Sequence, residues 1–341
     1  MRRALIRASG IECFASACSK ASSALAVLDV FARLLARMMP KHLPGTPVIN
    51  PQVMPGAGGI RMLDTMAKTS ARDGTVFAAI SPGILLEPLI GARKLDYSMT
   101  DLPPIGAMKR AGAVAISDDG RPVMNARVMR RAMELARSYD IPVINHCEDL
   151  HLSSGGDMHE GMESVRLGLR GIPAASEDVM VARDILLAEL TGVHYHIAHI
   201  SSSRSVAMAQ FAKAKGLRVT AEATPHHLAL ADADMQPYDS NYKMKPPLRG
   251  TDDVSAVVEG VVNGAIDAIA TDHAPHAGSE KMQEFEKCPF GILGLETAIG
   301  ISLEKLVLNS RISLNLFVEL FTTGPARILE LDRGTLAAGA A

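Results

Sequence analysis

The second part of this 341-residue sequence predicts an α/β fold built on a parallel sheet. After residue 110, apolar runs of strand length alternate with helical patterns of 12–16 residues, which is typical of βαβ units. Several of these runs are followed directly by Asp or His, and the carboxyl ends of parallel strands carry the site-building loops in TIM-type barrels. These two observations favour part of a TIM-type (β/α)8 barrel over an open doubly wound sheet.

The predicted elements of this part alternate in chain order. We expect strands at 112–117, 141–145, 193–200, 218–223 and 265–270, and helices at 124–139, 176–191, 203–215 and 251–263.

Composition narrows the class of protein. Hydrophobic residues make up 48% of the chain, charged residues make up 21%, and the net charge is −2. These values argue against a disordered chain and against nucleic-acid binding driven by bulk positive charge. No apolar run reaches the roughly 18 residues of a membrane span, and four irregularly spaced cysteines fit a reducing compartment. We therefore expect a cytoplasmic protein that acts on a small molecule, without a nucleic-acid or membrane partner; the sequence leaves a homo-oligomer open.

The charge distribution suggests two parts of different character. Residues 1–110 hold 14 Lys/Arg and 7 Asp/Glu, whereas residues 111–341 hold 21 and 30. We divide the chain into an unassigned Ala/Ser-rich segment (1–30), a segment at 31–110 and the α/β part at 111–341. Glu12 and Lys20 interrupt the apolar stretch that a signal peptide needs.

The front segment has a short helical and extended pattern. An amphipathic helix is predicted over 27–39 and should stop at Pro40. An extended piece at 47–60 leads into a Pro/Gly turn, whose glycines lack both G-x-G-x-x-G and G-K-[ST] spacing. A tight turn is therefore a better interpretation than a phosphate loop.

Four predicted strands end in residues that can ligate a metal. Asp118 and Asp119 follow the first strand, His146 the second, His199 the third and Asp272 the last. Because these strand ends share one face of a barrel, two imidazoles and two carboxylates should converge there. That donor set suits Zn²⁺ or a related ion.

Side-chain alternation separates the histidines of the strand at 193–200. His194 and His196 have the same parity, and His199 has the other. We expect His199 to belong to the site and the H-x-H pair to lie under the covering helices.

Seven segments between 112 and 338 resemble dihydroorotase, a cyclic amidohydrolase, and the order of TPHHL and TDHAPH is the most specific feature. Allantoinase and hydantoinase are near relatives. The segments are NHCED (145–149), GGDMHEG (155–161), RDILLAELTGVHYHIAHISS (183–202), VTAEATPHHL (219–228), YKMKPPLR (242–249), AIATDHAPH (268–276) and FGILGLET (290–297).

The resemblance implies strands 4–8 of a zinc-dependent barrel that interconverts carbamoyl-aspartate and dihydroorotate in pyrimidine biosynthesis. It implies that Zn²⁺ is held by His146 and His199, with Asp119 bridging two ions. It further implies that Asp272 touches the second ion and shuttles the proton. Substrate contacts are implied at Lys245, His276, Phe290 and Gly291.

The sequence also departs from this family. The family has an H-x-H pair on its first barrel strand, but this sequence has no H-x-H before residue 194. His42 is the only histidine before His146. Lys245 stands where many members have Asn. We therefore expect at most one well-liganded zinc and impaired activity, with an inactive amidohydrolase remnant as an alternative.

Residues 31–109 resemble a different family. The elements MPGAGG (54–59) and DGT (73–75) resemble those of substrate-binding proteins of tripartite tricarboxylate transporters. This implies an α/β fragment of foreign origin in front of the barrel, and it gives a second alternative, a carboxylate-binding protein.

Overall fold

The computed structural model describes residues 11–17, 33–34, 36–42, 48–55, 76–79, 105–110 and 112–336. Contacts divide the chain into two units, Met1–Pro104 and Ile105–Ala341. The predicted boundary at 110/111 lies slightly later in the chain. Each unit is described by itself.

The first unit contains a small parallel sheet. Its strands are β1 (Ile11–Ala17), β2 (Ile49–Pro55) and β3 (Val76–Ala79), in the order β2-β1-β3. β2 lies within the extended piece predicted at 47–60, whereas the glycine turn after it lies outside the described residues. β1 lies in the first 30 residues, where no strand was predicted.

The predicted helix at 27–39 is described in part. Residues 33–34 and 36–38 are helical, and a 3-10 helix, η1 (Met39–His42), follows. The α-helical residues thus end before Pro40, as predicted, and the chain continues as a 3-10 helix. Proline is tolerated in a first turn because its missing N–H has no helical partner there, and here it lies near the start of η1.

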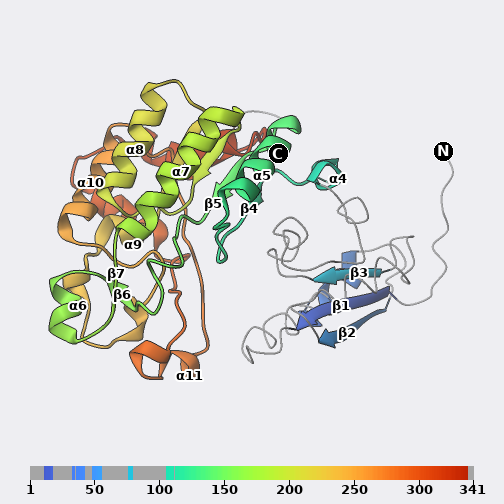
Figure 1. The fold of residues 1–341 in the computed structure, drawn as a ribbon, viewed down its shortest axis with the longest axis horizontal. Helices are drawn as coiled ribbons and strands as arrows, with labels where there is room; N and C mark the ends of the chain where they lie inside the picture. The colour runs from blue at the N-terminus through green and yellow to red at the C-terminus, as the bar shows by residue number, and fades with distance from the viewer. Residues whose placement is uncertain are drawn as a thin grey trace. The chain divides into compact units, whose positions relative to one another are not determined.

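The second unit is built on five parallel strands (Figure 1). Their order in the sheet, β10-β9-β8-β5-β4, is the reverse of chain order, so each strand pairs with the next one along the chain. All five lie inside the predicted ranges: β4 (Ile116–Ser117), β5 (Val143–Asn145), β8 (Tyr195–Ile197), β9 (Val219–Ala223) and β10 (Ala268–Ile269). The prediction of a parallel α/β sheet is confirmed.

The four predicted crossover helices are also present. They are α5 (Ala126–Ser138), α7 (Ala175–Thr191), α8 (Ser203–Ala214) and α10 (Thr251–Val262), and they pack side by side in that order (Figure 1). Local sequence explains their ends. Asn125 and Ser202 accept hydrogen bonds from the first peptide N–H groups of α5 and α8, and Gly192 closes α7 in the left-handed conformation.

Shorter elements surround this frame. A buried apolar cluster includes Met158, Met244 and Phe285, and Leu230 and Ile292 pack against it. The shorter elements are α4 (Ile105–Arg110), β6 (Met158–His159), α6 (Met162–Leu167), β7 (Gly171–Ile172), α9 (Pro225–Ala229), η4 (Asp232–Asp234), η5 (Ser240–Tyr242), α11 (Gly278–Lys281), η6 (Phe285–Lys287), α12 (Ala298–Ser302), the π-helical η7 (Leu303–Leu308), α13 (Leu314–Phe321) and α14 (Thr323–Ile328).

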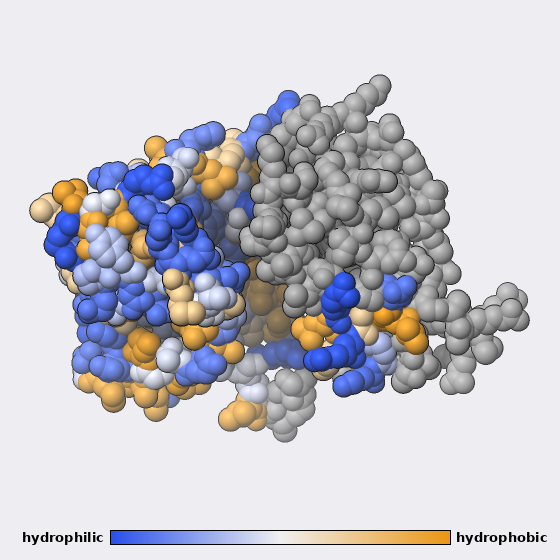
Figure 2. Space-filling model, turned by 90° about the horizontal axis from the view of Figure 1, so that it is seen from below, coloured by the Kyte–Doolittle hydropathy of each residue, from blue (hydrophilic) through white to orange (hydrophobic). Residues whose placement is uncertain are grey.

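The surface of the described part is mixed in polarity. On the face drawn in Figure 2, hydrophilic and hydrophobic residues are interspersed. Exposed apolar side chains such as Met162 and Met282 are normal for a folded protein. Within the described ranges, every helix is too short or too polar to cross a bilayer.

Candidate metal centre

Three residues that follow adjacent strands meet at the carboxyl edge of the five-stranded sheet. Asp119 follows β4, His146 follows β5 and His199 follows β8. His146 Nδ1 lies 2.8 Å from His199 Nε2, and Asp119 Oδ1 lies 3.4 Å and 3.9 Å from these two nitrogens. The structure thus brings together three of the residues that the sequence analysis singled out for a metal.

Asp118 and Asp119, which both follow β4, make different contacts. Asp118 Oδ1 accepts a hydrogen bond from the His146 peptide N–H at 3.0 Å, and its Oδ2 accepts one from the Val123 N–H at 2.8 Å. Asp118 therefore fixes two loops to each other. Its partner Asp119 keeps a half-exposed carboxylate that faces the two imidazoles.

His146 is oriented by a second carboxylate. Its Nε2 lies 3.0 Å from Glu148 Oε2, while Lys245 Nζ donates to Glu148 Oε1 at 2.5 Å. Burial would raise the pKa of Glu148, but the hydrogen bonds from His146 and Lys245 lower it to about 2. Glu148 is therefore ionised, and it leaves His146 Nδ1 facing His199. A carboxylate behind a ligand histidine is a usual feature of metal sites.

The charges around His199 favour a cation. Burial alone would lower the pKa of His199, but contact with Asp119 and the charge of Asp272 raise it to about 9. The same contact lowers the pKa of Asp119 to about 2, whereas burial raises the pKa of Asp272. A buried imidazole that gains a proton despite desolvation marks a point where positive charge is stabilised.

The donor geometry fits a tetrahedral ion. Ligand atoms bound to Zn²⁺ at their usual bond lengths lie about 3.3 Å apart, and the three separations here are 2.8, 3.4 and 3.9 Å. Two imidazole nitrogens and a carboxylate oxygen are donors that zinc accepts. Because Nε2 of His199 and Nδ1 of His146 point at each other, both can turn toward one ion with small movements.

Asp272 follows β10 at the same edge. Its electrostatic partners include His199, Asp119 and His146, although it lies outside the tight group of three. Its backbone φ of 45° lies in the left-handed region, as does that of His199 at 31°. Both residues are therefore held at turns that redirect the chain directly after a strand.

The remaining predicted residues lie on loops beyond the strand ends. Lys245 Nζ stands 4.7 Å from the ring centre of Phe290. His276 Nε2 donates to the Phe290 carbonyl at 2.8 Å, and the Gly291 N–H donates to the Lys243 carbonyl at 2.9 Å. These contacts gather Lys245, His276, Phe290 and Gly291 on two linked loops.

Known proteins resemble this chain over much of its length. A family model described as "Dihydro-orotase-like" matches residues 93–205. The dihydroorotase of Solibacter usitatus is 67% identical over 251 residues, which are 74% of this chain and 58% of that protein. The dihydroorotase of Pelotomaculum thermopropionicum is 49% identical over 289 residues, which are 83% of this chain and 68% of that protein. This chain belongs to the dihydroorotase family.

This dihydroorotase-family chain spans less than two thirds of the length of the S. usitatus relative. Solved structures support its fold. The L-hydantoinase of Arthrobacter aurescens has a TM-score of 0.62 and 24% identity, over 70% of this chain and 56% of that one. The dihydropyrimidinase of Brevibacillus agri has a TM-score of 0.62 and 18% identity, over 97% of this chain and 66% of that one.

The predicted location of the H-x-H pair is wrong in this dihydroorotase-family chain. His194 and His196 do share one face, because both rings contact Thr220 Oγ1, at 2.9 and 2.8 Å. The helices cover the other face, however, where the Asn145 side chain donates to Asp184 of α7 at 2.8 Å. Since Asn145 pairs with Ile197, odd-numbered residues of β8 face the helices and His196 faces away.

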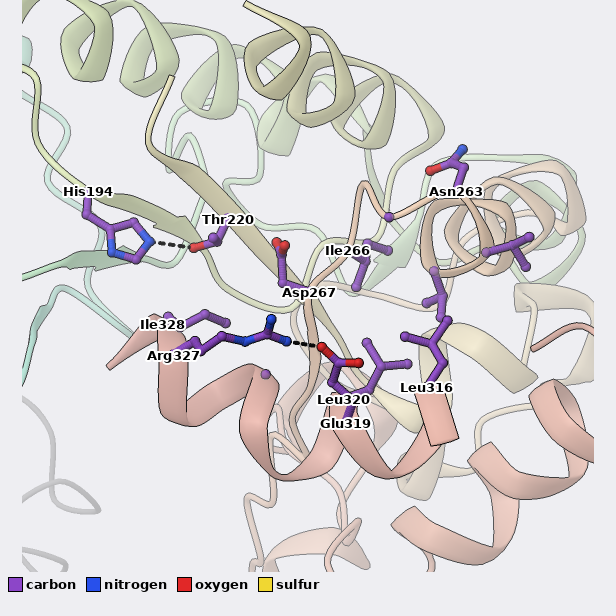
Figure 3. A pocket seen from close by; sticks show the side chains of 14 residues that line it. His194, Thr220, Asn263, Ile266, Asp267, Leu316, Glu319, Leu320, Arg327 and Ile328 are labelled. Carbon is purple, nitrogen blue, oxygen red and sulfur yellow. Dashed lines mark hydrogen bonds and ion pairs between the residues drawn. The ribbon is translucent and has the colours of Figure 1, made fainter. Parts of the chain in front are cut away.

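His194 lies beside a cavity at the opposite end of the sheet. It precedes β8 and Asp267 precedes β10, so both mark the amino ends of strands. The cavity has a volume of about 520 Å³, and α13 and α14 cover it with residues such as Leu320 and Arg327 (Figure 3). This cavity thus lies at the amino end of the sheet, opposite the carboxyl edge that carries the metal centre.

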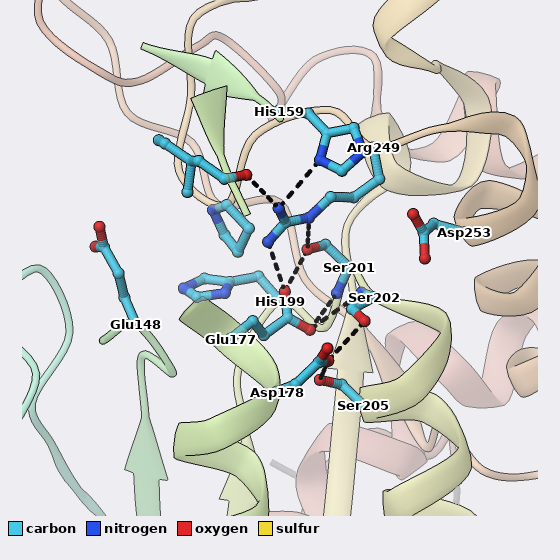
Figure 4. A network of polar contacts seen from close by, with 12 residues as sticks. Glu148, His159, Glu177, Asp178, His199, Ser201, Ser202, Ser205, Arg249 and Asp253 are labelled. Atoms are coloured by element: carbon cyan, nitrogen blue, oxygen red, sulfur yellow. Dashed lines mark hydrogen bonds and ion pairs between the residues drawn. The ribbon is translucent and has the colours of Figure 1, made fainter. Parts of the chain in front are cut away.

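Three charged residues near the centre were missed as functional candidates. Glu148 lies in NHCED, Arg249 ends YKMKPPLR, and Glu177 lies in the third position of α7. Figure 4 shows Glu177 and Arg249 close to His199. The motif segments that contain Glu148 and Arg249 were the available signal, whereas nothing local marks Glu177.

Proposed function

We propose that the carboxyl-edge site is a zinc-dependent cyclic amidohydrolase centre that interconverts carbamoyl-aspartate and dihydroorotate. The observation that carries this proposal is the meeting of Asp119, His146 and His199 within a chain of the dihydroorotase family. Relatives named dihydroorotase support the substrate class.

In this proposal, His146 Nδ1, His199 Nε2 and Asp119 Oδ1 hold the ion. When bound, zinc supplies Lewis-acid polarisation and lowers the pKa of water in its coordination sphere. Glu148 holds the His146 ring in the tautomer that presents Nδ1 inward. Asp118 keeps the Asp119 loop at its distance from His146.

Asp272 is assigned the proton transfer. Its pKa is raised by burial, which makes its carboxylate a stronger base than an exposed aspartate. Asp272 would take the proton of the attacking water at its carboxylate oxygen and deliver it to the ring nitrogen that leaves. The charge of His199 opposes this rise of the Asp272 pKa, whereas the charge of Asp119 adds to it.

The linked loops are assigned to substrate binding. Lys245 carries a positive charge that suits the carboxylate of either substrate, and the ring of Phe290 lies against that ammonium group. His276 and the Phe290–Gly291 backbone would contact the ring amide. Their present mutual hydrogen bonds would be exchanged for substrate contacts.

We further propose that the five parallel strands correspond to strands 4–8 of a (β/α)8 barrel, with residues 31–109 a fragment of transporter-protein origin. Residues 1–145 contain His42 as their one histidine, so the family's H-x-H pair has no counterpart there. We infer one well-liganded zinc, and activity below that of a centre with the complete ligand set.

The test measures the number of zinc ions bound per molecule of the purified full chain and then the rate at which this protein turns over dihydroorotate. We expect about one zinc, which is lost in His146→Ala and in His199→Ala. His194→Gln is the matched control, because it changes a histidine at the far end of the same strand. Zinc content that is unchanged in both alanine variants would show that the site is wrongly assigned, and no turnover with zinc bound would refute the activity.

A further inference from the structure

The backbone at His199 is held in an uncommon conformation. Its φ of 31° lies in the left-handed region, which is unfavourable for a residue with a side chain. Such a turn persists only where neighbouring contacts impose it. His199 Nε2 faces His146 from this turn, so contacts that hold the turn also hold the ligand geometry.

Glu177 holds the chain immediately after this turn. Its Oε1 accepts hydrogen bonds from the peptide N–H groups of Ser201 and Ser202, at 3.0 and 3.1 Å. Its Oε2 accepts the Ser201 hydroxyl hydrogen. Glu177 is 2% exposed and lies in the first turn of α7, where the helix end favours negative charge.

Arg249 contacts both Ser201 and Glu177. Its Nε donates to Ser201 Oγ at 3.0 Å, and another guanidinium nitrogen lies 3.3 Å from Glu177 Oε2 (Figure 4). A third contact joins it to the Ile172 carbonyl at 3.3 Å. Arg249 is also 2% exposed. The Ser201 hydroxyl is thus enclosed between a buried cation and a buried anion.

The same arginine ends the segment that carries Lys245. Lys245 contacts Glu148, and Glu148 contacts His146. Polar contacts therefore join Lys245 to His146 through Glu148, and Arg249, four residues further along the same segment, contacts Ser201, which is two residues after His199.

We propose that Glu177 and Arg249 are positioning residues that fix His199 Nε2 for metal binding. This inference rests on the proposed metal centre. Buried ion pairs contribute little net stability compared with apolar residues of the same size, so stability alone gives a weak reason for this pair. The hydrogen bonds of Glu177 end on the peptide N–H groups of Ser201 and Ser202, the second and third residues after His199, which gives a geometric reason.

The structure supplies matched controls on the same elements. Asp178 is the neighbouring carboxylate, 8% exposed, and it accepts hydrogen bonds from the hydroxyls of Ser202 and Ser205 at 2.7 and 2.9 Å. Ser205 is as buried as Ser201. Asp178→Asn and Ser205→Ala therefore disturb a comparable buried network without touching the peptide groups that Glu177 holds.

The experiment titrates the metal-free full chain with Co²⁺ and follows its visible absorption, which reports coordination geometry. Glu177→Gln keeps the side-chain shape but places an amide NH₂ against the Arg249 guanidinium. We expect Glu177→Gln and Ser201→Ala to bind Co²⁺ about 10–100-fold more weakly, with an altered spectrum. Asp178→Asn and Ser205→Ala should keep the wild-type affinity and spectrum.

The outcomes separate this inference from the proposed function. If wild type binds Co²⁺ and His199→Ala does not, while Glu177→Gln and Ser201→Ala match wild type, only the positioning role is overturned. Equal weakening in both control variants would also overturn it, because disturbance of any buried network near these serines would then explain the effect. If Glu177→Gln does not fold, Ser201→Ala still decides. A wild-type chain that binds no Co²⁺ would refute the metal centre and this inference together.

Discussion

Gly291→Ala tests how tightly the substrate-side loops are packed. Gly291 has a φ of 135°, which only glycine adopts readily. A Cβ there would lie 2.7 Å from the Ala274 carbonyl oxygen, 2.8 Å from the Ala274 Cβ and 2.9 Å from His276 Nε2. Backbone strain costs about 1–3 kcal/mol and overpacking about 1–3 kcal/mol more. We expect a loss of about 2–6 kcal/mol in the free energy of unfolding.

The assay is thermal and urea unfolding of the full chain, with Gly278→Ala as control. At Gly278 an added Cβ meets nothing within 4 Å, so that variant should unfold like wild type. For a unit of this size each kcal/mol lowers Tm by about 2–4 °C. If Gly291→Ala unfolds at the same temperature as Gly278→Ala, the packing of the Ala274–Gly291 contact is not as described.

Three further predictions concern buried polar groups. Burial lowers the pKa of His227 to about 3 from 6.5, so the folded chain opposes protonation of His227, and the free energy of unfolding falls as pH drops below about 6.5. In urea unfolding between pH 6 and 4, His227→Gln should reduce the pH dependence of this free energy by about 1.4 kcal/mol per pH unit. Equal pH dependence in wild type and variant would contradict this. Asp118→Ala leaves two peptide N–H groups, one of them that of His146, without their acceptor. We expect the free energy of unfolding to fall by about 2–4 kcal/mol and bound zinc to be lost. Retained zinc would show that Asp118 does not position the loop of Asp119. Arg183→Met leaves the buried Asp184 carboxylate without its ion-pair partner, at 2.7 Å in the native chain; unfolding should require about 3–5 kcal/mol less, and a change below about 1 kcal/mol would refute this.

Much of the frame could be predicted because its signal is local. The five strands and four crossover helices follow from apolar runs and helical periods, and parallel pairing follows from their alternation. The strands are shorter than predicted, as in β4, which pairs over Ile116–Ser117 alone. Apolar runs mark burial, whereas a ladder also needs a neighbouring strand at each residue. The meeting of Asp119, His146 and His199 followed from the same topology.

The orientation of the sheet could not be read in the same way. Parity showed that His194 and His196 share a face, but only packing decides which face the helices cover. That choice depends on contacts such as Asn145 with Asp184, which are 39 residues apart. Glu177 and Arg249 are separated by 72 residues. A buried pair of this kind has no periodic pattern in the sequence, because its partners meet only in the folded chain.

The order of the five strands also has a kinetic consequence. Each of the five strands pairs with the next of the five along the chain, and β6 and β7, which lie between β5 and β8, pair with each other, so no pairing has to wait for a distant segment of the unit. The closing entropy of the intervening loops grows only with the logarithm of their length, by about 0.6 kcal/mol for each doubling. The successive pairings therefore have similar entropic costs. This unit can assemble progressively as it leaves the ribosome, one βα step at a time, with β10 joining last.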